Sequence, residues 1–278
     1  MDIPELKLRD GHSLPVIGYG TVFLKGGDAV QSFKHAIDNG YRLLDTAYNY
    51  ENEGTLGKAI RQASAGREEL TVTSKLPGRY HEYSEALKAI EESLYRAQLD
   101  HFDLYLIHWP NPKEGKYVEA WQALIEAKKR GLVRSIGVSN FLPEHIEQLD
   151  KETGELPVIN QIEMHPFFNQ ADQRKWHEER KIVTESWSPL FRGRGVLSEP
   201  AIMTLAESYG KTPAQIVLRW HYQHGVVSIP RSAHPDRQRE NLAIFDFELS
   251  EEDMEKIDSL SRPDGRIDDQ DPAVYQEF

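Results

Sequence analysis

The feature that most constrains the fold is an alternation that runs through all 278 residues. Short apolar, β-branched runs are followed by longer amphipathic stretches of helical length, and eight runs of the strand type can be counted. This alternation indicates parallel βαβ units with right-handed crossovers. Eight units in a chain of this length favour a closed (β/α)8 TIM barrel over an open doubly wound sheet. The runs are LPVIGYG, YRLLDT, ELTVTSK, FDLYLIHW, LVRSIGVSN, PVINQIEM, KIVTESWSP and GVVSIP.

The two ends of the chain have different patterns. Near the N-terminus, ELKLRDGHSLPVI alternates around Asp10 and Gly11, which predicts a β-hairpin that caps the bottom of the barrel. The last segment, about 261–278, is polar and irregular, so we expect it to be either disordered or a flap. No linker or low-complexity segment divides the chain, and we therefore expect one barrel domain over residues 1–278.

The composition limits the class of protein. No apolar run reaches the roughly 18 residues that a membrane helix needs, and the N-terminus is charged, unlike a signal peptide. The absence of Cys excludes disulfides, thiolate metal ligands and a cysteine nucleophile, and it fits a cytoplasmic enzyme. The net charge of −12 disfavours a nucleic-acid partner.

Polar residues end several of the expected strands. Asp45, Lys75 and His108 close the second, third and fourth strands, and in parallel barrels the chemistry lies at these carboxyl ends. Because neighbouring strands are about 4.8 Å apart, the three side chains can converge. Tyr50 follows Asp45 in the next loop and can fold over it. Each residue alone has an ordinary structural explanation, but together they predict a catalytic site.

These four residue types suit proton transfer to an oxygen atom. A phenol has a pKa of about 10 and is a poor acid at neutral pH. An ammonium group about 4 Å away, at an effective dielectric constant of about 20, is worth about 4 kcal/mol and can lower that pKa by up to about three units. Asp45 would hold Lys75 charged, and His108 could donate a hydrogen bond to a carbonyl oxygen. This set suits reduction of an aldehyde or ketone by a hydride-carrying cofactor.

Six long motifs resemble the signatures of the aldo-keto reductase family and occur in the family's order. They are LLDTAYNYENEGTLGKAI, VTSKL, DLYLIHWP, RSIGVSNF, VINQIEMHP and IPRSAHPDRQRENL. The resemblance covers essentially the whole chain and is strongest to the bacterial branch that includes 2,5-diketo-D-gluconate reductases. It implies an NADPH-dependent oxidoreductase, by family default a monomer, on a barrel without a Rossmann fold. It also implies a catalytic tetrad of Asp45, Tyr50, Lys75 and His108, with Tyr50 as the proton donor.

The same resemblance implies a binding site for NADPH in three parts. The residues expected at the nicotinamide are Ser139, Asn140, Gln161 and Trp187. The residues expected at the pyrophosphate are Ser188, Leu190 and Arg192. The residues expected at the adenosine and its 2′-phosphate are Arg231, Ser232, Arg237, Glu240 and Asn241.

The arginine-rich segment favours NADPH over NADH. Arg231, Arg237 and Arg239 form a local basic group on a chain of net charge −12, which an anionic ligand explains better than a solvated face. The family usually has lysine where Arg231 stands. Arginine keeps the charge but can also bind a phosphate through two parallel hydrogen bonds.

The substrate is expected to be a small polar carbonyl compound. The resemblance implies a pocket wall made of Val22, Phe23, Tyr48, Pro77, His108 and Trp109, with His165 and the tail near Tyr275 as further candidates. Family members often have an aromatic residue in place of Val22 and tryptophan in place of Pro77, so this pocket has less bulk. We therefore expect an accessible pocket for keto-sugars, α-dicarbonyls or small aldehydes.

Two alternatives remain open. A metal-dependent hydrolase or isomerase could use Asp45, His108, Glu163 and His165 as ligands. We expect no metal, because Lys75 would place a cation in that cluster and the arginine motif would have no task. The second alternative is a regulatory subunit that senses NADPH with little turnover, as in some relatives of the family. An intact tetrad favours turnover.

Overall fold

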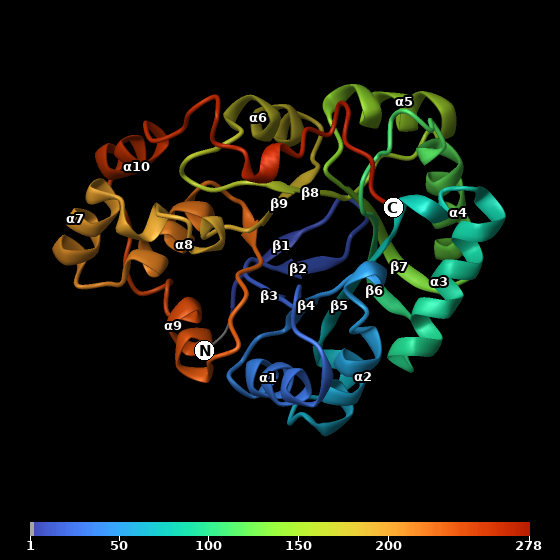
Figure 1. The fold of residues 1–278 in the computed structure, drawn as a ribbon, viewed down its shortest axis with the longest axis horizontal. Coiled ribbons are helices and arrows are strands. Elements are labelled where there is room, and N and C mark those ends of the chain that lie inside the picture. The colour runs from blue at the N-terminus through green and yellow to red at the C-terminus, as the bar shows by residue number, and fades with distance from the viewer. Residues whose placement is uncertain (1–2) are drawn as a thin grey trace.

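The structure is a computed structural model that describes residues 3–278. Eight parallel strands form one sheet in chain order, and the strands lie in the middle of a ring of helices (Figure 1). The ring of strands closes because Ile17 pairs in parallel with Ser228 and the Gly18 N–H donates to the Ser228 carbonyl at 2.8 Å. The strands are β3 (Tyr19–Gly20), β4 (Leu43–Asp45), β5 (Thr71–Leu76), β6 (Phe102–Ile107), β7 (Val133–Ser139), β8 (Ile159–Glu163), β9 (Val183–Trp187) and β10 (Val227–Ser228). The predicted (β/α)8 barrel is confirmed.

The helices follow the amphipathic stretches of the sequence. The first turn of α8 is stabilised by a capping box. The Gln215 N–H donates to Thr212 Oγ1 at 3.3 Å, and Gln215 Oε1 accepts from the Thr212 N–H at 3.0 Å. None of the helices within residues 3–278 combines the length and apolar character needed to cross a membrane. The helices are α1 (Gly26–Asp38), α2 (Glu53–Gln62), α3 (Tyr83–Ala97), α4 (Tyr117–Lys129), α5 (Pro143–Thr153), α6 (Ala171–Glu179), α7 (Pro200–Tyr209), α8 (Pro213–Gln223), α9 (Pro235–Leu242) and α10 (Glu251–Asp258).

The predicted hairpin lies across the N-terminal end of the barrel. Strands β1 (Glu5–Lys7) and β2 (Ser13–Pro15) pair in antiparallel register. Leu8 and Leu14 are buried in one cluster with the apolar residues of the barrel interior. Ser135, near the start of β7, donates to Asp10 Oδ2 at 2.7 Å. The hairpin therefore closes the end of the barrel opposite the functional candidates.

The barrel interior is apolar in its lower part and polar at its upper end. Leu43, Leu104, Leu106 and Ile159 pack together inside. Gly137 makes room for them, since a Cβ there would lie 2.5 Å from Ile159 Cγ2. Side chains two residues further along the same strands point the same way. The next inward layer therefore consists of polar groups that the apolar layer supports from below.

The polar tail runs back over the carboxyl ends of the strands, from α10 toward α4 (Figure 1). It is held by backbone contacts along its length: the Arg262 N–H donates to the Phe167 carbonyl at 3.1 Å, and the Ile267 N–H donates to Glu163 Oε1 at 2.5 Å. Of the two possibilities that the sequence left open, a flap describes this arrangement.

Candidate active site

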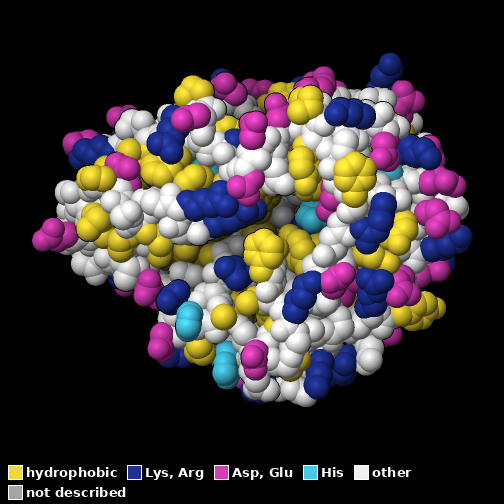
Figure 2. All heavy atoms as spheres, viewed as in Figure 1, with side chains coloured by type: hydrophobic (Ala, Val, Ile, Leu, Met, Phe, Trp, Pro, Cys, Tyr) yellow, Lys and Arg dark blue, Asp and Glu magenta, His cyan; other side chains and the backbone are white. Residues whose placement is uncertain are grey.

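A cavity of about 1010 Å³ opens at the carboxyl ends of the strands. Figure 2 shows a hollow near the centre of this face, with Lys and Arg side chains along one side and a His side chain inside it. Residues from the loops after most of the strands line the cavity, together with residues of the tail. A volume of this size can hold a ligand considerably larger than a small carbonyl compound.

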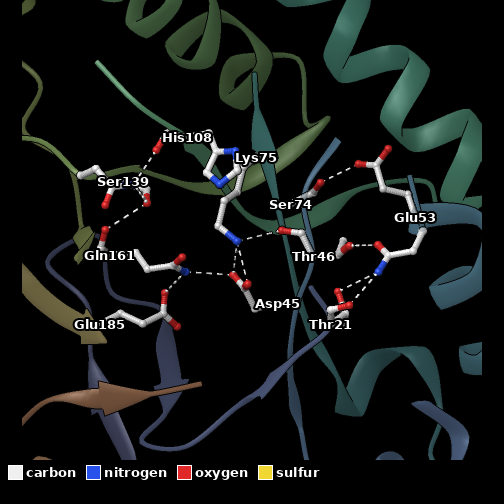
Figure 3. A network of polar contacts seen from close by, with 12 residues as sticks. Thr21, Asp45, Thr46, Glu53, Ser74, Lys75, His108, Ser139, Gln161 and Glu185 are labelled. Carbon is white, nitrogen blue, oxygen red and sulfur yellow. Dashed lines mark hydrogen bonds and ion pairs between the residues drawn. The ribbon is translucent and has the colours of Figure 1, made fainter. Parts of the chain in front are cut away.

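A buried ion pair forms the floor of the site (Figure 3). Lys75 Nζ lies 2.6 Å from Asp45 Oδ1 and 2.7 Å from Oδ2, and it donates to the Thr46 carbonyl at 2.9 Å. The two side chains are only 0% and 2% exposed. Burying charges is costly unless they are paired and hydrogen bonded. Burial alone would lower the pKa of Lys75, but the charges of Asp45 and Tyr50 outweigh it, so the pKa is raised and the side chain stays an ammonium.

Tyr50 lies above this pair, in the short 3-10 helix η1 (Tyr48–Tyr50). Lys75 Nζ is 5.1 Å from the centre of the Tyr50 ring, and the ring of His108 packs edge-on against it at 5.7 Å. The predicted convergence of the four residues is therefore observed.

The expectation of a lowered pKa for Tyr50 was wrong in its net direction. Desolvation by the surrounding side chains raises the pKa of the phenol, and the carboxylates of Asp45 and Glu277 raise it further. The ammonium of Lys75 lowers it, as expected, but does not outweigh burial. Tyr50 therefore keeps its proton at neutral pH, so the phenol is available as a donor.

A second buried carboxylate, Glu185 on β9, is joined to the pair through Gln161. The Gln161 side-chain amide donates to Asp45 Oδ2 at 2.9 Å and to Glu185 Oε2 at 2.7 Å (Figure 3). Because both amide hydrogens are used, Gln161 Oε1 is the atom that remains for a ligand. Burial and the nearby charge of Asp45 raise the pKa of Glu185 to about 8. The sequence contained a signal for Glu185 that we did not use: it stands two residues before Trp187 and thus faces the interior.

The next strand end carries a linked set of polar groups. Asn140, with a left-handed φ of 62°, donates to the His108 carbonyl and to Ser139 Oγ, both at 3.0 Å. Its Oδ1 accepts from the Trp187 indole at 2.7 Å. Ser139 Oγ donates in turn to the Gln161 carbonyl at 3.0 Å. These bonds fix the positions of the side chains that the resemblance assigns to the nicotinamide.

The arginine-rich loop after β10 forms another part of the cavity wall. Arg231 and Arg237 line the cavity and are exposed, and neither forms an ion pair within residues 3–278. Arg239 differs, because it pairs with Asp236 and does not line the cavity. The Ser232 carbonyl in this loop accepts from Tyr19 Oη at 2.7 Å and from Gln238 Nε2 at 3.0 Å. Hydrogen bonds from Tyr19 and Gln238 thus hold the loop in place, while Arg231 and Arg237 line the cavity.

The structure brings most of the predicted residues to the cavity. The twelve residues expected at NADPH all line it, as do Val22, Phe23, His108 and Trp109. Tyr48 and Pro77 do not line it. Tyr48 is 7% exposed and packs beside α3, where its hydroxyl accepts from Arg96 at 2.8 Å. Pro77 instead follows the last residue of β5 and directly precedes the 3-10 helix η3 (Gly78–Tyr80).

Two residues of the metal alternative also lie outside the cavity. Glu163 and His165 contact each other at 2.9 Å, and both are buried. His165 packs against Phe191 at 4.5 Å between ring centres. Within the described part of the chain, no group of three or more His, Asp or Glu side chains is arranged to hold a metal ion.

The tail brings Tyr275 to the site, as the sequence indicated, together with Glu277 and Asp268, which the sequence did not indicate. Glu277 lines the cavity with its carboxylate 2.6 Å from His108 Nδ1. Tyr275 packs against Trp109 at 4.4 Å between ring centres. Asp268 pairs with Arg192 and Arg194, each at 2.7 Å. The tail therefore forms part of the pocket wall.

Comparison with known proteins gives the same family as the motifs. The model of the aldo/keto reductase family matches residues 16–262. The chain is 50% identical over 277 residues to 2,5-diketo-D-gluconic acid reductase B of a Corynebacterium species, covering 100% of this chain and 99% of that protein. It is 45% identical over 258 residues to methylglyoxal reductase DkgA of Escherichia coli, covering 92% and 93%.

Solved structures agree with this assignment. A crystal structure of a Gox0644 mutant in complex with NADPH has a TM-score of 0.94 at 43% identity and covers 99% of this chain and 100% of that chain. The family match and the polar carboxyl end of the barrel thus place the chain in a class of oxidoreductases that are built on a (β/α)8 barrel. The chain belongs to the aldo/keto reductase family.

Proposed function

We propose that the protein reduces an aldehyde or ketone to an alcohol with NADPH, and that Tyr50 donates the proton. The observation that carries this proposal is the buried Lys75–Asp45 pair placed against a protonated Tyr50 beside His108. The pair needs no external partner, so the proton-transfer machinery is in place before a substrate enters.

The residues present fit a dinucleotide. Gln161 offers a carbonyl oxygen, and the Trp187 side chain lines the same cavity. Arg231 and Arg237 offer positive charge that no carboxylate of the described chain neutralises, which suits a phosphate. The complex of the Gox0644 mutant with NADPH supports this assignment. Arg192 and Ser188 would lie over the pyrophosphate, and Glu240 and Asn241 beside the adenine.

The roles of the catalytic residues follow from their positions. Bound NADPH would supply a hydride to the carbonyl carbon. His108 would orient the carbonyl oxygen by donating a hydrogen bond, and Tyr50 would transfer its proton to that oxygen. After the proton transfer Tyr50 would be a phenolate, and the ammonium charge of Lys75 would stabilise it. Asp45 would keep Lys75 in place.

The substrates we propose are small polar carbonyl compounds, including keto-sugars and α-dicarbonyls. The names of the two relatives, which refer to 2,5-diketo-D-gluconic acid and to methylglyoxal, support this class. The remaining alternative is a protein that binds NADPH chiefly for regulation. Steady consumption of NADPH with methylglyoxal would exclude it.

The test of the proposed function is Tyr50→Phe. The variant keeps the ring and removes the proton, so we expect kcat to fall by about 10²- to 10⁴-fold while the KM for NADPH stays close to that of the wild type. Steady-state kinetics with methylglyoxal and NADPH measures both. Full turnover by Tyr50→Phe would remove Tyr50 as the acid.

A further inference from the structure

Glu277, the penultimate residue, places a carboxylate in the cavity that the proposed mechanism does not use. Its side chain is 10% exposed, and its Oε1 lies 2.6 Å from His108 Nδ1. Asn49 Nδ2 donates to the same oxygen at 2.7 Å, and the Gly78 N–H donates to Oε2 at 3.1 Å. Three different loops thus hold this one carboxylate next to a member of the tetrad.

The backbone of the tail is fastened at the same residue. The Glu277 N–H donates to Asn111 Oδ1 at 2.9 Å, and Asn111 Nδ2 donates to the Glu277 carbonyl at 2.7 Å. Asn111 is fully buried. Gly78 allows this close approach, because a Cβ there would lie 2.5 Å from the Glu277 carbonyl oxygen. The loops that carry Gly78 and Asn111 therefore hold the backbone of Glu277 in one position.

The charge of Glu277 is not cancelled by a lysine or arginine of the described chain. Within residues 3–278, the only group at ion-pair distance from this carboxylate is the His108 imidazole, which balances the charge only when it is protonated. Lys25 and Arg192 also line the cavity, but they pair with Glu51 and Asp268.

The carboxylate also stays ionised. Burial acts to raise its pKa, but His108, Asn49 and the Gly78 N–H together hold the pKa below its usual range. A substrate whose carbonyl lies near His108 and Tyr50 would therefore meet this carboxylate at close range, and its negative charge would oppose any attraction of an anion by the His108 imidazole.

We propose that Glu277 determines substrate specificity: its carboxylate, held against His108, selects against carbonyl compounds that carry a negative charge and favours neutral ones. This inference rests on the proposed function. Two like charges a few ångströms apart in a partly desolvated pocket repel each other strongly. The names of the two relatives refer to one anionic and one neutral substrate, and Glu277 assigns this chain to the neutral class.

The test compares two aldehydes of matched shape, 4-nitrobenzaldehyde and 4-carboxybenzaldehyde. In Glu277→Gln the shape is kept and the charge removed. We expect the ratio of kcat/KM for the anionic aldehyde to that for the neutral one to rise about tenfold or more. A merely structural role would change both values by a similar factor and leave the ratio unmoved. Glu207→Gln, an exposed carboxylate on α7 away from the cavity, is the matched control and should leave the ratio unchanged.

Binding measurements make the test independent of turnover. The Kd values of 4-nitrobenzyl alcohol and 4-carboxybenzyl alcohol, measured by calorimetry with NADP⁺ present, should show the same change in ratio. An unchanged ratio in both experiments overturns the role of Glu277. Absence of turnover with a changed binding ratio would instead count against the proposed function and leave the specificity assignment standing.

Discussion

The two ends of the cavity differ in how complete they are without a ligand. At the catalytic end, Lys75 and Asp45 are fully paired and almost wholly buried. At the other end, Arg231 and Arg237 are exposed and have no ion-pair partner within residues 3–278. The catalytic end is thus organised by the protein itself, whereas the basic end is organised for a charge that a ligand must bring. Substitutions at the two ends should therefore have different consequences.

The largest effect is expected at the catalytic end. Lys75→Met removes the partner of a buried carboxylate, so the free energy of unfolding should fall by about 3–5 kcal/mol. The kcat/KM should fall by about 10³-fold or more, because the phenolate of Tyr50 would lose its stabilising charge. Urea denaturation and steady-state kinetics measure the two quantities. Lys58→Met, at an exposed lysine on α2, is the control. A Lys75→Met protein with wild-type stability would show that the pair is not the structural centre of the site.

Substitutions at the basic end should weaken the binding of NADPH and leave the free energy of unfolding almost unchanged. Replacing Arg231 and Arg237 by alanine should raise the KM for NADPH by about 100-fold or more relative to that for NADH, since two charge-assisted hydrogen bonds are together worth about 3–6 kcal/mol. Arg239→Ala is the matched control, because that arginine already pairs with Asp236 and does not line the cavity. Equal changes with NADPH and NADH would argue against binding of the 2′-phosphate.

The smallest effect is the change in stability between pH 6 and pH 8 that Glu185 causes at the catalytic end. The pKa of Glu185 is raised from 4.5 to about 8, so between these values the folded protein holds a proton that the unfolded chain has lost. Stability contributed by this group therefore falls as the pH rises from about 4.5 to 8 and changes little above that. The loss is about 1.4 kcal/mol per pH unit at most.

Glu185→Gln has no such proton to lose. We expect the stability of this variant relative to wild type to be higher at pH 8 than at pH 6, as measured by urea denaturation at both values. The Glu207→Gln protein should show no such difference between the two pH values. A Glu185→Gln difference independent of pH would mean that Glu185 is ionised in the folded protein throughout this range.

Much of the fold could be read from local pattern. Eight apolar runs separated by amphipathic stretches become β3 to β10 and their intervening helices, because burial on both faces demands continuous apolar strands. The same periodicity locates Asp45, Lys75 and His108, since residues that follow inward-facing apolar positions on parallel strands must share one end of the barrel. Glu185 also follows an inward-facing position on its strand, but it lies inside the run KIVTESWSP and not at its end, so we did not predict it.

Other features could not be read in this way. Tyr48 is next in sequence to the active-site loop, but its ring turns toward Arg96 and Tyr80 and away from the cavity. The net direction of the pKa of Tyr50 depends on how much solvent the surrounding residues exclude. Neither follows from spacing, because both depend on side chains that approach from other elements.

The sequence by itself determined the barrel, the class of chemistry at its carboxyl end and the residues that the strands carry there. Periodicity and strand ends are local properties of the sequence. In a parallel barrel they fix the three-dimensional arrangement, because all strands end at the same side of the barrel. The sequence raised the possibility that the tail returns to the site as a flap, but only the tertiary structure decided which groups it meets there: Glu277 lies against His108, and Asp268 pairs with Arg192. A polar tail has no period that fixes its path, so its position is set by the complementary groups that it meets on the loops of the barrel.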